Sequence, residues 1–397
     1  MKRFFSILLS LVLFISCTLH PESLLHAKKK TQSSQPSLDL SAPSALLMEA
    51  ETGTILYQKK EHNSRPPASV TKIMTLCLIF DALEKNQIAL TDEVTVSENA
   101  ASMGGSQVFL EAGEVQTVET LIKCISIASA NDACVAMAEF ICGSEDEFVA
   151  QMNQKAAGLG MEDTHFVNCC GLSADGHLTS AYDIGLMARE LSIRHPQIHD
   201  YCTIWMENII HHTRKGDSEF GLANTNKLLK QYPYATGLKT GYTSAAKYCI
   251  AATAEKDGVK LIAVLMGAPD IKSRTADAQT LLNYGFSVCR VYKDQNPAPL
   301  PEIAIKKGDK DSAALTYESD MSYVSTSGED LNQITKKMKL PKVADAPVRK
   351  GDTAGKVTYY LGEKEIGHIN ILYAESVEHA AFADYFLSLL QKLFFLA

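Results

Sequence analysis

The sequence predicts an α+β protein in which an antiparallel sheet packs against a cluster of helices, followed by a small all-β domain and a C-terminal amphipathic helix. Strand-like segments lie at both ends of residues 41–292, with apolar helical segments between them. Layer packing brings such end segments into one sheet that the helices cover. The stretch KDQNPAPLPE then predicts a stiff linker, and short alternating runs predict a β-rich domain over residues 293–375.

The first predicted elements are a strand pair over residues 45–60, with a turn at Glu51-Thr52-Gly53. Apolar residues at helical spacing predict the helices that follow. Ser144 and Ser180 stand where residues that cap a helix N-terminus are expected. The predicted helices cover residues 69–85, 118–127, 133–142, 144–157 and 180–194.

Strands return in the segments GLKTGYT, KYCIAATA and VKLIAVLMGA, which cover residues 237–243, 247–254 and 259–268. Asp257-Gly258 lies between the last two strands and is typical of a two-residue hairpin turn. A helix over residues 272–290 closes this unit. These strands and the first strand pair are expected to form one sheet.

The N-terminus has the pattern of a secretory signal. Lys2 and Arg3 precede an apolar run from Phe4 to Ile15, and cleavage is expected near Ala27. Residues 28–40 are then a flexible lead-in. Lipidation of Cys17 is the alternative, although the residues before it fit a lipoprotein signal poorly. Both interpretations predict an exported protein.

Residues 376–397 form the last predicted element, a helix whose polar residues lie on one narrow stripe (Asp384, Ser388, Gln391 and Lys392). An apolar helix of this kind can be part of a core, but at the end of a chain it favours a membrane interface. We therefore expect a periplasmic protein that is tethered by this helix to the outer face of the cytoplasmic membrane.

Composition argues against a nucleic-acid partner and does not decide whether the cysteines form disulfides. The formal net charge is −8, and Lys and Arg are dispersed among acidic residues, so the sequence predicts no nucleic-acid partner. Cys77, Cys124, Cys134 and Cys142 fall in apolar helical segments, where a thiol packs as a small apolar group, and we interpret most of the ten cysteines in this way. No spacing typical of a zinc site occurs, and the sequence does not decide whether the adjacent Cys169 and Cys170 are bridged.

The chemistry is suggested by the stretch PASVTK, in which Ser69 and Lys72 are three residues apart at the start of a helix. Residues at this spacing share a helix face, so the hydroxyl and the amine are expected to meet. A serine needs a neighbouring base to become a nucleophile. Lysine can be that base when burial or a second cation disfavours its ammonium form.

Two further tripeptides raise the specificity of this motif. Lys239-Thr240-Gly241 lies on a predicted strand, and Ser129-Ala130-Asn131 interrupts two apolar helices. The competing Ser97-Glu98-Asn99 is predicted in an open polar loop. A second SxxK match, Ser244 to Lys247, falls in a turn with no helix after it, and we discard it.

The order SxxK, SxN, KTG resembles that of penicillin-binding proteins and class A β-lactamases. Within that group the chain is similar to the low-molecular-mass D-alanyl-D-alanine carboxypeptidases. The segments that carry this resemblance are PPASVTKIMT, SANDACVAMAE, FVNCCGL, NTNKLL and GLKTGYTSAAKYCIAATA. The resemblance implies a β-lactamase/transpeptidase-like catalytic domain, a second β-rich domain, a membrane anchor and no cofactor or metal.

The resemblance also implies roles for the acylation residues. Ser69 would be acylated by the penultimate D-alanine of a peptidoglycan stem peptide, or by a β-lactam antibiotic. Lys72 would be the base for this attack, and Ser129 would bridge the two lysines and pass a proton to the leaving amine.

The remaining site residues are implied to bind substrate. The Asn131 amide would hold the peptide, and Lys239 and Thr240 of the KTG motif would bind the terminal carboxylate. The oxyanion would rest on the backbone N–H groups of the nucleophile and of Tyr242. A glycine such as Gly241 at a strand edge lets a substrate backbone approach closely.

One departure from the family's pattern concerns the binding of the substrate carboxylate. Thr225, in NTNKLL, stands where some members have an arginine near the substrate carboxylate. Arg274 is a possible replacement, but we expect it to be a solvated charge at a helix start.

Two other functions stay open at this point. A β-lactamase shares the acylation half, but Thr164 stands where its loop glutamate is expected, four residues before Asn168. A catalytically silent cell-wall-binding protein has no need for two crowded lysines. The balance of carboxypeptidase, endopeptidase and transpeptidase activity is not decided by the sequence, because all share one acyl-enzyme.

Overall fold

The computed structural model describes residues 37–213, 216–294, 298–326, 328–382 and 386. The predicted signal peptide (1–27), nearly all of the lead-in, Cys17 and most of the predicted C-terminal helix lie outside the described residues. Within the described part of the chain, no helix has the length and apolar character needed to cross a bilayer.

A five-stranded antiparallel sheet forms the centre of the first domain, with the order β2-β1-β9-β8-β7. Its strands come from both ends of this part of the chain, as predicted. They are β1 (Ser44–Glu49), β2 (Ile55–Lys59), β7 (Ala235–Thr243), β8 (Lys247–Lys256) and β9 (Val259–Ala268). Asp257 and Gly258 both have positive φ, 51° and 78°, which is the conformation of the predicted Asp-Gly hairpin turn.

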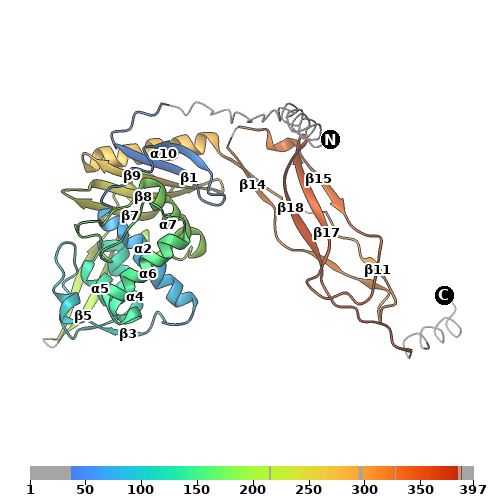
Figure 1. Ribbon diagram of the computed structural model, residues 1–397, viewed down its shortest axis with the longest axis horizontal. Helices are drawn as coiled ribbons and strands as arrows, with labels where there is room; N and C mark the ends of the chain where they lie inside the picture. Colours follow the sequence, from blue (N-terminus) through green and yellow to red (C-terminus); the bar gives the residue numbers. More distant parts are fainter. Residues whose placement is uncertain (1–36, 214–215, 295–297, 327, 383–385, 387–397) are drawn as a thin grey trace, which may run out of the picture. The chain divides into compact units, whose positions relative to one another are not determined.

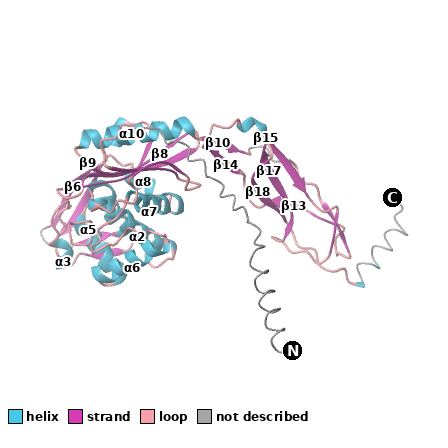
Figure 2. Ribbon diagram, turned by 45° about the horizontal axis from the view of Figure 1, so that its top comes forward, coloured by secondary structure: helices cyan, strands magenta, loops and turns pink. Residues whose placement is uncertain are grey.

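Helices cover both faces of this sheet. The helix α10 (Ile271–Val288) lies along one face, and the helical cluster lies on the other (Figure 1, Figure 2). The cluster contains α2 (Lys72–Glu84), α4 (Val118–Lys123), α5 (Asn131–Cys142), α6 (Glu145–Gly158), α7 (Ala181–Arg194) and α8 (Ile198–Cys202). Residues of β1 alternate between the two resulting cores, with Leu46 and Met48 toward the cluster and Ala45 and Leu47 toward α10.

Capping by serine was predicted correctly at two helices and missed at a third. The Ser144 and Ser180 hydroxyls accept hydrogen bonds from the backbone N–H of Glu147 and Asp183. The segment around Ser97 is not an open loop, because Ser97 caps the short helix α3 (Glu98–Ala101) in the same way.

Two strand pairs in this domain were not predicted. They are β3 (Glu93–Thr95) with β4 (Val115–Thr117), and β5 (Met206–Thr213) with β6 (Gly216–Ala223). A short helix α9 (Leu228–Gln231) follows the second pair. These strands are short or largely exposed, so they carry little of the apolar alternation that identifies a strand.

The C-terminal part of the chain is all β, as predicted. A four-stranded sheet has the order β13-β18-β17-β15, and smaller sheets have the orders β12-β11-β16 and β10-β14. The strands are β10 (Arg290–Lys293), β11 (Ile303–Lys306), β12 (Ser312–Ala313), β13 (Leu315–Tyr317), β14 (Ser322–Ser325), β15 (Ile334–Lys339), β16 (Val343–Asp345), β17 (Thr353–Leu361) and β18 (Lys364–Tyr373). The predicted domain limits at residues 292 and 375 stay predictions.

Candidate active site

The predicted nucleophile lies on a tight turn immediately before α2. Residues Ala68–Thr71 form a 3-10 turn (η1), and α2 itself begins at Lys72. Side chains three residues apart are eclipsed in this geometry, so Ser69 and Lys72 are brought together more directly than in the predicted α-helical turn. Lys72 Nζ lies 3.2 Å from Ser69 Oγ, and Ser69 is half-buried.

Lys72 is enclosed by acceptors. Its side chain is fully buried, and Nζ donates to Asn131 Oδ1 and to the Cys170 carbonyl, both at 2.6 Å. A neutral amine has two N–H groups and one lone pair. Because the two carbonyl oxygens can only accept, they use both N–H groups of the neutral amine and leave its lone pair for the Ser69 hydroxyl. The arrangement therefore suits a base directed at Ser69.

The SxN motif is held by an unusual helix end. The predicted helix over 118–127 changes at Cys124–Ala128 into a π-helical turn, η2. That turn ends in Ser129, which has the left-handed conformation (φ 63°, ψ 34°). A non-glycine residue rarely adopts it, and π-bulges are frequent at functional sites. Ala130 has ordinary φ and no exposed surface, so a small residue fits between the two polar ones.

Ser129 and Asn131 each contact one of the two lysines. Lys239 Nζ donates to Ser129 Oγ at 2.8 Å, and Asn131 Oδ1 contacts Lys72. The Asn131 backbone N–H and side-chain amide also donate to the carbonyls of Ser106 and Gly104, both at 2.7 Å. The SxN turn thus lies between the amines of the SxxK and KTG motifs.

Lys239 extends from β7, the edge strand of the sheet, into a buried position. Its side chain is 2% exposed. Burial, assisted by the positive charges of Lys72 and Arg274, lowers the pKa of Lys239 to about 7. This amine can therefore exchange a proton near neutral pH.

The other KTG residues border the same space. Thr240 Oγ1 lies 2.9 Å from Thr225 Oγ1. Thr225, which stands where some family members have an arginine, therefore positions the hydroxyl of the KTG threonine. A Cβ placed on Gly241 would lie 2.9 Å from the backbone nitrogen of Ser69. Only glycine lets β7 pass so close to the nucleophile. The Tyr242 ring is 54% exposed and lies against the Tyr248 ring, with centroids 4.5 Å apart.

Asn168 holds the backbone of the loop that contains Cys170. Asn168 Oδ1 accepts hydrogen bonds from the backbone N–H groups of Cys170, Gly171 and Leu172. A Cβ on Gly171 would lie 1.9 Å from the Ala68 carbonyl oxygen, so the loop packs directly on the nucleophile turn. Thr164 donates to Asp183 Oδ2 at 2.7 Å and does not face Lys72.

A buried histidine links the same loop region to the nucleophile turn η1. His177 Nδ1 accepts from the Val167 backbone N–H, so Nε2 carries the proton and donates to Thr71 Oγ1 at 2.9 Å. Burial lowers the pKa of His177 to about 4, and the neighbouring His165 contributes. The neutral ring therefore supports the loop by two hydrogen bonds.

Arg274 is the site residue that the sequence interpretation placed wrongly. It is not a solvated charge: it is 4% exposed, and burial lowers its pKa. Its Nη1 lies 3.5 Å from the carbonyl of Cys249, the residue that pairs with Gly241 in the β7–β8 ladder. A charged residue is expected at the surface, and only the packing of α10 on the sheet shows that this one lies behind the KTG motif.

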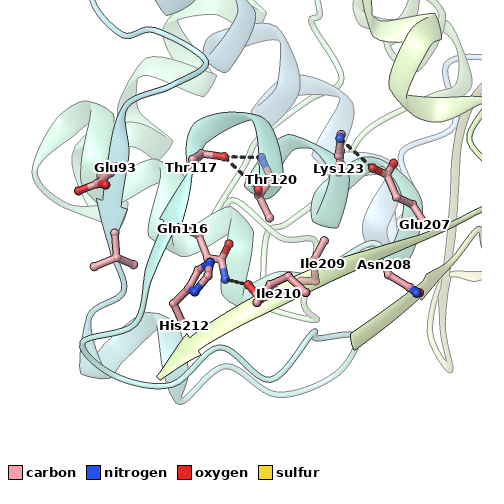
Figure 3. A pocket seen from close by; sticks show the side chains of 11 residues that line it. Glu93, Gln116, Thr117, Thr120, Lys123, Glu207, Asn208, Ile209, Ile210 and His212 are labelled. Atoms are coloured by element: carbon pink, nitrogen blue, oxygen red, sulfur yellow. Dashed lines mark hydrogen bonds and ion pairs between the residues drawn. The ribbon is translucent and has the colours of Figure 1, made fainter. Parts of the chain in front are cut away.

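Ser244 and Lys247 of the discarded motif are both exposed. A pocket of about 350 Å³ adjoins the nucleophile turn, with Pro67, Ala68, Gly171 and Thr243 in its wall. A second cavity of about 600 Å³ lies by β3, β4, α4 and β5 and contains none of the predicted site residues (Figure 3). In its wall, Lys123 Nζ lies 2.8 Å from Glu207 Oε1.

Two groups of metal-ligating side chains occur among the described residues. In the first, donor atoms of Glu145, Cys169 and Cys170 lie within 4.8 Å of one another, and the Glu145 carboxylate accepts from the Cys169 backbone N–H. The second consists of Asp81, Glu84 and His195, where Lys155 Nζ lies 2.8 Å from Asp81 and Arg194 Nη2 lies 2.7 Å from Glu84. Protein groups already contact the carboxylates of both clusters.

Comparison with known proteins identifies one family over most of the chain. The family model of the D-alanyl-D-alanine carboxypeptidases matches residues 29–270, and that of the C-terminal domain of penicillin-binding protein 5 matches residues 290–379. The D-alanyl-D-alanine carboxypeptidase DacF of Bacillus subtilis is 40% identical over 389 residues, which are 97% of each chain. DacA of Escherichia coli is 32% identical over 341 residues, 83% of this chain and 82% of the relative.

Solved structures agree. Penicillin-binding protein 5 of Haemophilus influenzae is 29% identical, covers 87% of this chain and 99% of its own, and has a TM-score of 0.67. Penicillin-binding protein 6B of Escherichia coli is 29% identical, covers 85% and 97%, and has a TM-score of 0.64. With both domains matched and the three motifs gathered around one serine, the chain belongs to the D-alanyl-D-alanine carboxypeptidase family of penicillin-binding proteins.

Proposed function

We propose that this enzyme removes the terminal D-alanine of peptidoglycan stem peptides through an acyl-enzyme on Ser69, with Lys72 as the base. The observation that carries this proposal is the surroundings of Lys72 Nζ, which lies 3.2 Å from Ser69 Oγ while two carbonyl oxygens lie 2.6 Å away. In its neutral form the amine keeps both carbonyl contacts, and its lone pair can then accept the serine proton.

In the acylation step, Ser69 Oγ attacks the carbonyl carbon of the penultimate D-alanine, and Lys72 takes the hydroxyl proton. The peptide C–N bond then breaks, and the leaving amine needs a proton. Ser129 is placed to supply it and to recover a proton from Lys239, whose Nζ is 2.8 Å away. Because the pKa of Lys239 is lowered to about 7, its ammonium gives up a proton more readily than that of an ordinary lysine.

The developing oxyanion is bound by the backbone N–H groups of Ser69 and Tyr242. The Gly241 contact supports this assignment, since it holds the residue before Tyr242 against the nucleophile turn. Donors fixed in place by the fold stabilise charge that appears only in the transition state.

The substrate's terminal carboxylate binds to Lys239 and Thr240, and Asn131 holds the peptide. The buried guanidinium of Arg274 adds positive charge behind the same strand, which Thr225 does not supply. Carboxylate recognition in this chain therefore rests on two buried cations and one hydroxyl.

β-Lactam antibiotics acylate the same serine. Deacylation is expected to be slow, because Thr164 bonds to Asp183 and offers no carboxylate to activate a water. A short-lived penicilloyl adduct would instead favour the β-lactamase alternative. Penicillin binding without release of D-alanine from any muropeptide would favour the silent wall-binding alternative.

The enzyme is exported and is tethered at the outer face of the cytoplasmic membrane. The N-terminal signal pattern and the apolar C-terminal segment support this placement. Flotation with anionic phospholipid vesicles, comparing the mature chain with one that ends at residue 375, tests the tether. Equal flotation of both chains would contradict it.

The central experiment follows D-alanine released from an acyl-D-Ala-D-Ala peptide. Ser69→Ala should abolish both release and labelling by a fluorescent penicillin. Ser244→Ala is the matched control, since it removes the hydroxyl of the other SxxK match and should retain full activity. Activity that survives Ser69→Ala would refute the assignment of the nucleophile.

A further inference from the structure

Two adjacent thiols belong to the loop whose backbone contacts Lys72, the proposed base. Cys169 Sγ and Cys170 Sγ are 3.5 Å apart, and both side chains are buried. The Cys170 carbonyl accepts from Lys72, and the Cys169 carbonyl accepts from Thr75 Oγ1 at 2.6 Å. The backbone that carries this thiol pair is therefore also the backbone that positions the base.

We propose that Cys169 and Cys170 form a reversible disulfide under hydroperoxide and that this bond slows acylation of Ser69. The proposal rests on the role of Lys72 given above. No step of the carboxypeptidase reaction uses either thiol, so the pair is free for this second chemistry.

The surroundings of Cys170 suit it to be the thiol that reacts first. In its thiol form Sγ donates to the Asn131 carbonyl at 3.5 Å. Hydrogen bonds from Cys134 and Cys169 lower the pKa of the Cys170 thiol. Burial raises the pKa of Cys169 and of Cys134, so these two remain protonated donors. The thiolate is the reactive form of cysteine.

The reaction balances with one hydroperoxide. The Cys170 thiolate attacks a peroxide oxygen, the O–O bond breaks, and hydroxide leaves and becomes water on protonation. The sulfur of Cys169 then attacks the sulfenic acid on Cys170, the S–O bond breaks, and a second water leaves with the thiol proton. Two thiols and one hydrogen peroxide give one disulfide and two waters.

The bond would be labile. Neighbouring Cα atoms are about 3.8 Å apart, which is below the usual range of about 4.4–6.8 Å for bridged cysteines. Strained disulfides are the readily reduced, regulatory ones. This pair is thus suited to a switch and not to a permanent crosslink.

Bond formation would disturb the base directly. The sulfurs must close from 3.5 Å to about 2.05 Å, and the peptide between them has to rotate. That rotation moves the Cys169 carbonyl away from Thr75 and shifts Cys170, whose carbonyl orients Lys72. A misplacement of about 1 Å at a catalytic group costs up to roughly 100-fold in rate.

The test uses the full reduced chain with and without hydrogen peroxide. Peptide mapping by mass spectrometry locates the bond as a loss of two hydrogens, and a fluorescent penicillin measures the acylation rate. Cys169→Ser is the test variant, and Cys142→Ser, half-buried at the end of α5, is the matched control.

We expect wild type and Cys142→Ser to form the 169–170 bond, to acylate about 10- to 100-fold more slowly, and to recover with dithiothreitol. Cys169→Ser should show no loss of two hydrogens. A bond from Cys134 to Cys170, no bond, or a 169–170 bond with an unchanged acylation rate would each overturn the proposal. Failure of the proposed function is a separate result, since it appears as absent Ser69 labelling before any peroxide is added.

Discussion

Gly241→Ala tests the placement of the oxyanion donors relative to the nucleophile. An added Cβ would lie 2.9 Å from the Ser69 nitrogen and 3.0 Å from the Val70 nitrogen and the Pro67 oxygen. Ordinary contacts of this kind begin at 3.4 Å, so β7 or the nucleophile turn must move by about 0.5 Å. All three neighbours are backbone atoms, and no side chain can rotate away to absorb the change.

The expected loss follows from this displacement. A misplacement of about 1 Å at a reacting group costs on the order of 100-fold, so we expect acylation by a fluorescent penicillin to slow by about 10- to 100-fold. A tenfold loss corresponds to about 1.4 kcal/mol of transition-state stabilisation.

The assay compares second-order acylation rates, with the thermal unfolding midpoint measured in parallel. Gly158→Ala is the control, because no atom lies within 4 Å of its added Cβ and its φ is not in the left-handed region. An acylation rate of Gly241→Ala within twofold of wild type would show that the tight approach of β7 to Ser69 has no role in catalysis.

Three further predictions concern charge and proton transfer. The pKa of His177 is about 4 in the folded chain, against 6.5 for an unperturbed histidine, so the unfolded state binds the proton more strongly below pH 6.5. Stability is then complete above pH 6.5 and falls by up to about 3 kcal/mol toward pH 4, and urea unfolding should show a flatter pH dependence for His177→Asn. Arg274→Gln removes a cation that lowers the pKa of Lys239, so the alkaline limb of the pH profile of kcat/KM should move to higher pH. An unchanged alkaline limb would contradict the effect of the Arg274 charge on Lys239. Ser129→Ala removes the bridge to Lys239 and should reduce D-alanine release about 100-fold or more in steady-state assays, whereas a loss below about fivefold would exclude Ser129 as the proton carrier.

Much of this protein could be predicted from local sequence, because local physics decides it. The Asp257-Gly258 turn needs two residues that tolerate positive φ. The spacing of apolar residues in the helices and central strands follows from the burial of one or two faces of each element. Ser69 and Lys72 are only three residues apart, so their contact is a local property as well. The order of the motifs, by its resemblance to that of the family, then indicated Lys239 and Ser129 as candidate site residues.

Other features depend on contacts between residues far apart in the chain. The Cys170 carbonyl meets Lys72 across 98 residues, and no pattern in FVNCCGL announces that contact. Arg274 is charged, and charged residues usually lie at the surface. Its burial follows only from how α10 packs on the sheet. The conformation of Ser129 arises where a π-turn ends between two packed helices.

The sequence by itself therefore determined the longer helices, the central strands, the motifs and the chemical types of the candidate site residues, because propensity and spacing act over a few residues. Tertiary structure alone decided which carbonyls surround the base, which cations share the site and which proton equilibria result. Burial and Coulomb interactions depend on distances in space, and those distances exist only after the strands from both ends of the domain have joined one sheet.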